Sequence, residues 1–197
     1  MQPMEKDGQE KPRLWFWWLV FIAFVVIAVI AITRIPSLKK KAEVRAPGLY
    51  SINHFVDGDT ITVNMNGDVE TIRMIGIDTP ETHKPDTPVQ CYGEEAASYT
   101  KRLIGSSKVR LQADALDTNR DRYGRLLRYV YLADGTLVEE KIITAGYGFA
   151  YTSFPFEKAD QFKKDEREAK AGNRGLWAAC EVTTQTNGVR QTNPAAR

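Results

Sequence analysis

The sequence predicts an α+β domain built around a small, closed or partly closed antiparallel β-barrel and preceded by one transmembrane helix. Three observations lead to this prediction. An uncharged apolar run covers residues 14–33, β-like runs and helical patterns follow in a mixed order between residue 48 and about residue 180, and Asn66-Gly67 is a hairpin signal between two of the β-like runs. A doubly wound sheet would instead require strands and helices to alternate regularly.

The N-terminal run Leu14–Thr33, LWFWWLVFIAFVVIAVIAIT, has the length that an α-helix needs to cross a hydrocarbon layer about 30 Å thick. It follows a short flank, residues 1–13, and three tryptophans in its first turn match an interfacial aromatic belt. A cleaved signal peptide is the alternative, but its apolar core would span about 7–15 residues and end in an A-x-A-like site, which this run does not have. We therefore expect a single-pass membrane anchor.

The basic linker, residues 34–47, is expected to be a solvated juxtamembrane segment that can contact anionic lipid. It also accounts for the formal charge of +2, because 27 Lys+Arg oppose 25 Asp+Glu and the basic excess lies before residue 46. The rest of the chain is slightly acidic. Global charge therefore gives no argument for nucleic-acid binding, and any such argument has to come from local sites.

Residues 48–180 form one predicted domain, near the commonest domain size. Strands are expected at 49–56, 60–65, 70–77, 108–113 and 126–132, and helices at 93–104, 138–145 and 157–171. The tail, residues 181–197, has almost no large apolar side chain and is predicted to be disordered.

Acidic residues gather at the ends of predicted neighbouring strands. Asp57 and Asp59 flank Gly58 before the second strand, and Asp78 and Glu81 follow the third. Each pair alone would be compatible with an ordinary turn. Together these carboxylates would repel one another unless a cation held them, and hard oxygen ligands without Cys or His pairs point to calcium or magnesium rather than zinc.

Arginines accompany these acids. Arg73 lies inside an apolar strand, where an unpaired guanidinium would be costly to bury, so it needs either a substrate phosphate or the nearby acids. The segment TNRDRYGRLLRYVYL, residues 118–132, is rich in arginine, which is compatible with a solvated face but also suits phosphate and base recognition beside Tyr123. A hard metal, a carboxylate that positions water and two arginines together predict attack on a phosphodiester.

Five motifs in order, DGDT, IRMIGIDTPE, CYGEEA, DRYGR and GYGFAY, make the chain from Leu49 to Trp177 similar to the staphylococcal nuclease (thermonuclease) family. The resemblance implies a five-stranded OB-like β-barrel with three helices. It also implies a Ca²⁺-dependent endonuclease that hydrolyses DNA and/or RNA with water and leaves 5′-hydroxyl and 3′-phosphate ends.

The resemblance assigns a cation site and a general base. Asp59 and Asp78 match the two aspartates that bind calcium, and Thr79 matches the residue whose backbone carbonyl binds it. Glu81 matches the carboxylate proposed as general base. Each of these roles is carried over from the matching motif position.

The resemblance also assigns substrate contacts. Arg73 and Arg125 match the arginines that bind and stabilise the reacting phosphate. The positions that contact the terminal phosphate and the base of a bound nucleotide are Arg122, Tyr123 and Tyr151. A second base-contacting tyrosine of the family is absent, because Ser153 stands at that position next to Phe154.

The two cysteines, Cys91 and Cys180, are a candidate disulfide, with two free thiols as the alternative. A bridge would require an oxidising compartment. It would stabilise the fold by up to about 4–5 kcal/mol in the chain-entropy model and would tie the third helix back to the domain.

The charges around the apolar run conflict with the expected location. More basic residues follow residues 14–33 than precede them, which by the positive-inside rule would place the domain in the cytoplasm. A cytoplasmic nuclease would threaten the cell's own nucleic acid, calcium is scarce there, and large domains translocate with limited regard to charge. We therefore expect an extracytoplasmic domain, with a cleaved and secreted form as the alternative.

A rival hypothesis is a catalytically silent nucleic-acid- or protein-binding module on the same barrel, tethered to a membrane. A silent module is expected to have lost some of the catalytic set, and the chain retains all of it: Asp59, Arg73, Asp78, Glu81 and Arg125. The enzyme is therefore favoured. We expect a monomer that binds DNA and/or RNA and the membrane, and the sequence points to no protein partner.

Overall fold

The computed structural model describes residues 48–82, 88–186 and 188–195, and six residues of the N-terminal run, namely Trp18, residues 21–23, Val25 and Val26. The chain divides into two units, residues 1–39 and 40–197. The six described residues of the first unit are helical, whereas the rest of the predicted anchor, the flank and the linker lie outside the described residues. Within the described part of the chain, no helix has the length and apolarity that a membrane crossing requires.

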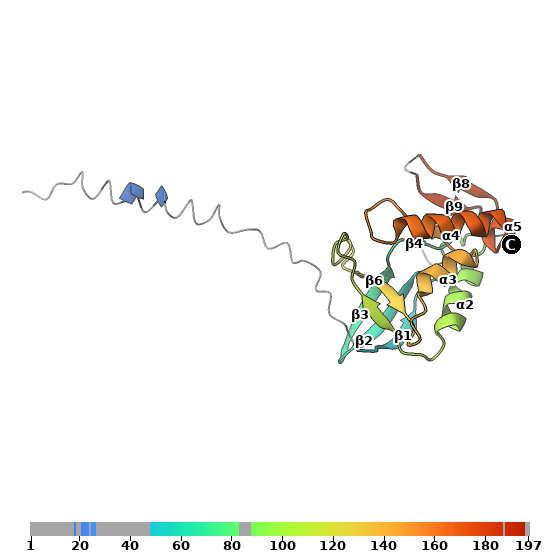
Figure 1. Cartoon of the computed structure of the whole chain (residues 1–197), viewed down its shortest axis with the longest axis horizontal. Coiled ribbons are helices and arrows are strands. Elements are labelled where there is room, and N and C mark those ends of the chain that lie inside the picture. Colours follow the sequence, from blue (N-terminus) through green and yellow to red (C-terminus); the bar gives the residue numbers. More distant parts are fainter. Residues whose placement is uncertain are drawn as a thin grey trace, which may run out of the picture. The chain divides into compact units, whose positions relative to one another are not determined.

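A five-stranded sheet underlies the second unit (Figure 1). Its strands are β1 (Ser51–Phe55), β2 (Thr60–Met65), β3 (Asp68–Met74), β5 (Arg110–Gln112) and β6 (Leu126–Tyr131), in the order β1-β2-β3-β6-β5. The five strands expected from the sequence are therefore present; β2 has the predicted ends, and the other four differ at one or both ends. The expected turn at Asn66-Gly67 is confirmed, because Met65 and Asp68 are the last pair of the β2–β3 hairpin.

The antiparallel prediction is wrong for one strand pair. β3 and β6 run parallel, with Arg73 opposite Leu127. A parallel pair needs a long crossover, and here α2 and β5 lie between the two strands in the chain. Directly before the edge strands β1 and β5, Tyr50 and Val109 exchange backbone hydrogen bonds of 2.8 and 2.9 Å. The parallel register places the start of β6 beside the end of β3, where Arg73 lies.

The predicted helices are present as α2 (Gly93–Ile104), α3 (Val138–Thr144) and α4 (Ala159–Ala171), followed by a short α5 (Leu176–Ala179). Figure 1 shows α2 and α3 beside the sheet and α4 at its end. A small second sheet pairs β4 (Ile77–Asp78) with β7 (Phe149–Ala150). Apolar side chains from the sheet and the helices are fully buried together, among them Ile61, Ile72, Ile77, Val130, Ile142 and Phe162.

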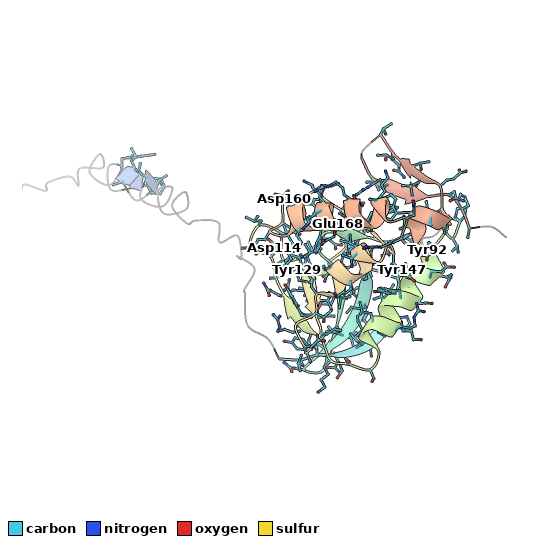
Figure 2. All side chains as sticks on the ribbon, turned by 45° about the vertical axis from the view of Figure 1, so that its right-hand side comes forward. Tyr92, Asp114, Tyr129, Tyr147, Asp160 and Glu168 are labelled. Atoms are coloured by element: carbon cyan, nitrogen blue, oxygen red, sulfur yellow. A yellow bond between two sulfur atoms is a disulfide. The ribbon has the colours of Figure 1, made fainter. Side chains whose placement is uncertain are left out.

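Helix α4 begins at Ala159 rather than at the predicted Glu157. The Glu157 N–H donates to Oδ2 of Asp114, a buried residue two positions after β5, at 2.7 Å. The same carboxylate accepts the hydroxyl of Tyr129 at 2.6 Å (Figure 2). One buried acid therefore ties the end of β5, β6 and the entry to α4 together.

The prediction of a disordered tail is wrong for residues 181–186 and 188–195. They contain an antiparallel hairpin of β8 (Val182–Thr184) and β9 (Arg190–Thr192), which Figure 1 shows next to α4. The prediction rested on the low apolar content, but polar contacts hold this hairpin. Arg190 forms an ion pair with Glu166 of α4, and Thr192 is buried. The amino-acid composition of a segment indicates how much apolar surface it can bury, but it does not indicate which polar contacts the segment makes with the rest of the fold.

The candidate disulfide is present in the structure. Cys91 and Cys180 are bonded, with their Cα atoms 5.9 Å apart. Cys91 lies shortly before α2 and Cys180 directly follows α5, so the bond joins the segment that precedes α2 to the end of the family-like part of the chain.

Candidate active site

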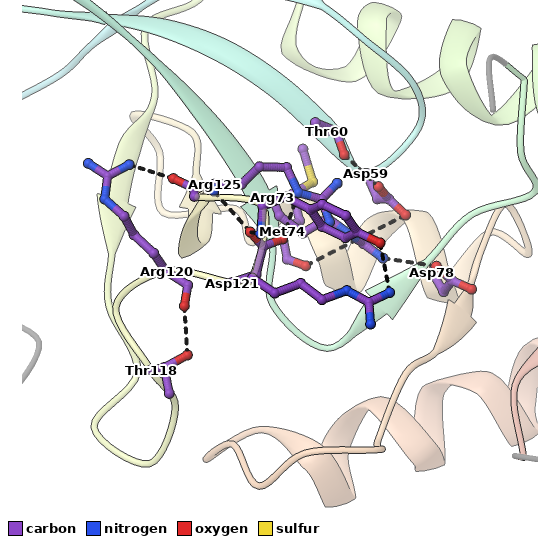
Figure 3. A network of polar contacts seen from close by, with 12 residues as sticks. Asp59, Thr60, Arg73, Met74, Asp78, Thr118, Arg120, Asp121 and Arg125 are labelled. Carbon is purple, nitrogen blue, oxygen red and sulfur yellow. Dashed lines mark hydrogen bonds and ion pairs between the residues drawn. The ribbon is translucent and has the colours of Figure 1, made fainter. Parts of the chain in front are cut away.

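Arg73 on β3 joins two strand ends through its guanidinium (Figure 3). Its Nη1 lies 2.9 Å from Oδ2 of Asp59, and its Nη2 lies 2.9 Å from Oδ1 of Asp78. Nη1 also donates to the carbonyl of Ile77 at 2.8 Å. Burial by itself lowers the pKa of Arg73, but the charges of Asp59 and Asp78 raise it above its usual value, so the side chain stays cationic. Of the two partners left open by the sequence, the acids hold Arg73 here.

Three carboxylates surround this single guanidinium. Burial, followed by the negative charge of Asp59, raises the pKa of both Asp57 and Asp78 well above the usual carboxyl range. Asp57 also accepts the Asp59 N–H at 3.1 Å, so the loop between β1 and β2 turns both acids toward the same region. Ionisation of all three acids would leave more negative than positive charge beside Arg73, and a further cation would stabilise that ionised form.

The donor set fits a hard divalent cation. Carboxylate oxygens of Asp59 and Asp78, with a backbone carbonyl such as that of Thr79, are the ligand types that calcium prefers. Among the described ranges, no group of three or more His, Cys, Asp or Glu side chains is arranged to hold a metal ion. A cation at Asp59 and Asp78 would therefore complete its coordination shell with backbone carbonyl and water oxygens.

Helix α2 supports both acid-bearing loops. The Thr100 hydroxyl donates to the Gly58 carbonyl at 2.7 Å, and Gly58 packs so closely on Thr79 that a Cβ would lie 2.7 Å from its hydroxyl oxygen. At the start of the helix, a Cβ on Gly93 would lie 3.0 Å from the Glu81 carbonyl oxygen. Glycine at positions 58 and 93 therefore allows the two loops to approach each other and the helix.

Glu81 lies next to the acid cluster. Its N–H donates to Oε1 of Gln90 at 2.9 Å, and its Oε1 accepts the Thr82 N–H at 3.0 Å. Its negative charge is one of the causes that raise the pKa of Asp78, after burial and Asp59. The structure thus pairs Arg73 with Asp59 and Asp78, and the charge of Glu81 acts on Asp78, while the roles assigned to these residues stay predictions.

The arginines of the DRYGR motif lie in the loop before β6, where Figure 3 shows Arg125 beside Asp121. Nε of Arg125 lies 2.7 Å from Oδ2 of Asp121, and Arg122 donates to the Tyr123 hydroxyl at 2.7 Å. The guanidinium carbons of Arg122 and Arg125 lie 4.8 and 5.5 Å from the centre of the Tyr123 ring, which is 68% exposed. Because β6 pairs with β3, this loop leads to the same end of the sheet as Arg73.

Tyr151 lines a cavity of about 410 Å³ beside the acids. Its N–H donates to the Gly76 carbonyl at 2.8 Å, and its ring packs edge-to-face on Phe154 with the centroids 5.3 Å apart. Asp78 and Arg190 line the same cavity. Tyr151, a predicted base contact, and Asp78, a predicted cation ligand, therefore line the same cavity.

Several residues that shape the site were not assigned to it from the sequence. Asp121 could have been found, because it carries the opposite charge to Arg125 and belongs to the same five-residue motif. Gln90, Thr100 and Arg190 carry no such signal. Their contacts join residues distant in the chain, which only the folded structure brings together.

Comparison with known proteins places these residues in a family. The model of the family described as staphylococcal nuclease homologue matches residues 71–179. The chain is 48% identical over 130 residues to the SPbeta prophage-derived endonuclease YokF of Bacillus subtilis (strain 168), covering 65% of this chain and 43% of that protein. It is 45% identical over 136 residues to Endonuclease YncB of the same organism, covering 68% of this chain and 64% of that protein.

A shorter relative is covered more completely. The chain is 39% identical over 130 residues to the Thermonuclease of Staphylococcus hyicus, covering 66% of this chain and 75% of that protein. The chain thus spans less than two thirds of the two Bacillus relatives and three quarters of the staphylococcal one. With the family match over more than half of its length, the chain belongs to the staphylococcal nuclease homologue family.

Proposed function

We propose that this protein is a calcium-dependent endonuclease that hydrolyses phosphodiester bonds of DNA and/or RNA with water and leaves 5′-hydroxyl and 3′-phosphate ends. The observation that carries the proposal is the convergence of Asp59 and Asp78 on Arg73, with Glu81 beside them, in a member of a nuclease family. The names of the relatives, two endonucleases and a thermonuclease, support it.

The acids supply the cation site and the base. Asp59, Asp78 and the Thr79 carbonyl would hold Ca²⁺, which supplies positive charge next to the phosphate oxygens. Glu81 would orient an attacking water and accept its proton, the role that the resemblance assigns to its motif position. The positive charge of Arg73 would attract the phosphate of a bound substrate.

The arginines and aromatic side chains would hold the nucleotide. Arg73 and Arg125 present planar, permanently charged donors that can contact two phosphate oxygens at once. Arg122 and Tyr123 would contact a neighbouring phosphate. Tyr151, at the cavity next to Asp78, would pack on a base, which suits single-stranded substrates because every base offers a π-face.

Incubation of the purified full chain with single- and double-stranded DNA and RNA tests this function. We expect cleavage in the presence of calcium and no cleavage in excess chelator. Because the proposed fragments have 5′-hydroxyl ends, a kinase specific for 5′-hydroxyl groups should label them without prior phosphatase treatment. Asp59→Asn should abolish cleavage, whereas Asp68→Asn, which removes an exposed acid from β3, should not. Cleavage that persists in chelator would reject the cation requirement, and an inactive but folded protein would favour the silent binding module.

Two further expectations stay proposals. We infer that the sheet closes as an OB-like barrel, supported by the backbone bonds between Tyr50 and Val109 beside its two edge strands. We also propose that the domain lies outside the cytoplasm, anchored by residues 14–33, which is supported by the bond between Cys91 and Cys180 because disulfides persist in oxidising compartments.

A further inference from the structure

Gln90 holds the backbone of Glu81 at two points. The Glu81 N–H donates to Gln90 Oε1 at 2.9 Å, and the Gln90 N–H donates to the Glu81 carbonyl at 2.9 Å. That same carbonyl oxygen is the atom that a Cβ on Gly93 would approach to 3.0 Å. The position of Glu81 therefore depends on the position of Gln90 as well as on the start of α2.

The segment that carries Gln90 is paired with the residues at the end of the C-terminal hairpin. Four contacts join residues 89–91 to residues 192–195. The Ala195 N–H donates to the Val89 carbonyl at 2.9 Å, the Cys91 N–H donates to the Asn193 carbonyl at 2.7 Å, and Gln90 and Pro194 form a β-bridge. The Thr192 hydroxyl donates to the Cys91 carbonyl at 2.8 Å. The chain after β9 thus runs beside residues 89–91 like an added strand.

The hairpin is anchored at a second place. Arg190 forms an ion pair with Glu166 of α4 and donates to the Ala150 carbonyl of β7. Its guanidinium also lies 5.3 Å from the centre of the Phe149 ring. Because β9 is fixed to α4 and β7 at Arg190 and to the Cys91 carbonyl at Thr192, it can hold residues 89–91 in one position.

We propose that the C-terminal hairpin is part of the active-site framework and positions Glu81 through Gln90. The proposal rests on the proposed nuclease function, and it assigns a role to residues 192–195, which lie beyond the 71–179 matched by the family model. Gln90 and Thr192 are positioning residues, since their contacts are with backbone atoms of Glu81 and Cys91. Misplacement of a catalytic group by about 1 Å can reduce a rate by about 10²-fold, so small shifts of this framework reach the chemistry.

Substitutions in the full chain test the link. Gln90→Ala removes the acceptor of the Glu81 N–H, and Thr192→Val removes the hydroxyl while keeping the shape of the side chain. Gln191→Ala is the matched control, because Gln191 neighbours Thr192 on β9 but its side chain bonds Gln185 across the hairpin at 2.7 Å. We expect kcat to fall at least about tenfold in Gln90→Ala and by a smaller factor in Thr192→Val, with KM within about twofold of wild type, while the control keeps its kcat.

Two further measurements separate positioning from general destabilisation. In a Glu81→Gln background, Gln90→Ala should cause no further loss of kcat, because the side chain through which it acts is already impaired. The Glu81 amide should exchange its hydrogen faster in Gln90→Ala and in Thr192→Val than in the control. An undiminished kcat in Gln90→Ala, or losses that multiply with Glu81→Gln, would overturn the proposal in an active protein. If the wild-type chain cleaves no nucleic acid, the proposed function is rejected. In that case the positioning role is still tested by hydrogen exchange, and an unchanged exchange rate of the Glu81 amide in Thr192→Val would reject it.

Discussion

Nη1 of Arg73 lies 2.9 Å from Oδ2 of Asp59, and the two side chains expose only 13% and 7% of their surfaces. The same Asp59 oxygen accepts the N–H of Thr79 at 3.0 Å. One carboxylate oxygen therefore joins the start of β2, the end of the central strand β3 and the loop after β4. A cation that drew Asp59 into its coordination shell would weaken the hold of this acid on Arg73 and leave the guanidinium more available to a phosphate.

Calcium and a nucleotide phosphate are therefore expected to bind cooperatively. Because binding free energies are linked reciprocally, the factor by which calcium tightens nucleotide binding equals the factor by which the nucleotide tightens calcium binding. Titration calorimetry of a non-hydrolysable nucleotide with and without calcium, and of calcium with and without nucleotide, measures both factors. Asp59→Asn should abolish the coupling, and equal nucleotide affinities in the presence and absence of calcium would contradict it.

Arg73→Lys and Arg125→Lys should each reduce kcat by at least about 10²-fold, the scale for losing one transition-state donor, although both keep the positive charge. A lysine is a point charge and cannot make the planar two-pronged contact with phosphate oxygens. Steady-state kinetics on a defined oligonucleotide provides the measurement. Arg110→Lys, which changes an arginine that stacks on Tyr131, is the control and should stay active.

The two arginine variants should differ in stability. Arg73 bridges the buried Asp59 and the half-buried Asp78, whereas the side chain of Arg125 is paired with Asp121 in a loop and is 30% exposed. Arg73→Lys is therefore expected to lower the thermal midpoint more than Arg125→Lys does. Near-wild-type rates for both lysine variants, with the fold intact, would reject the assigned phosphate contacts.

Glu81→Gln should fold, bind calcium and bind nucleotide, but turn over slowly. The amide keeps the shape of the side chain yet cannot accept a proton from water, so the loss should appear in kcat, on the scale of about 10²–10⁴-fold for a general base. Calcium and nucleotide titrations of the variant provide the control. Loss of calcium affinity would mean that Glu81 is a cation ligand, and the role of base would then have to be reassigned.

The bond between Cys91 and Cys180 should be formed in the cell. If the domain lies outside the cytoplasm, protein alkylated immediately on harvest should shift in mobility when reductant is added, and protease added to intact cells should digest the domain. Removal of the bond by Cys91→Ser should lower the free energy of unfolding by up to about 4–5 kcal/mol. Free thiols in the cell combined with full protease protection would place the domain in the cytoplasm, as the basic linker alone would indicate.

The sequence by itself determined the local elements and the identity of the candidate site. The Asn66-Gly67 turn and the complete span of α2 were predictable because their signals lie within a few residues of the chain. The residues of the acid cluster were identified by ordered motifs, and the structure pairs Asp59 and Asp78 with Arg73, a pairing that could not be derived from spacing.

The tertiary structure decided the features that depend on contacts between distant residues. The choice of acids as the partners of Arg73, the parallel register of β3 and β6, and the order in the C-terminal hairpin all belong to this group. Arg190 and Glu166 show the physical reason. The ion pair between β9 and α4 and the hydrogen bond from Thr192 to Cys91 stabilise a polar segment once the folded domain has brought the partners together. Both partners, Glu166 and Cys91, lie outside residues 181–197, so the sequence of that segment alone could not reveal them.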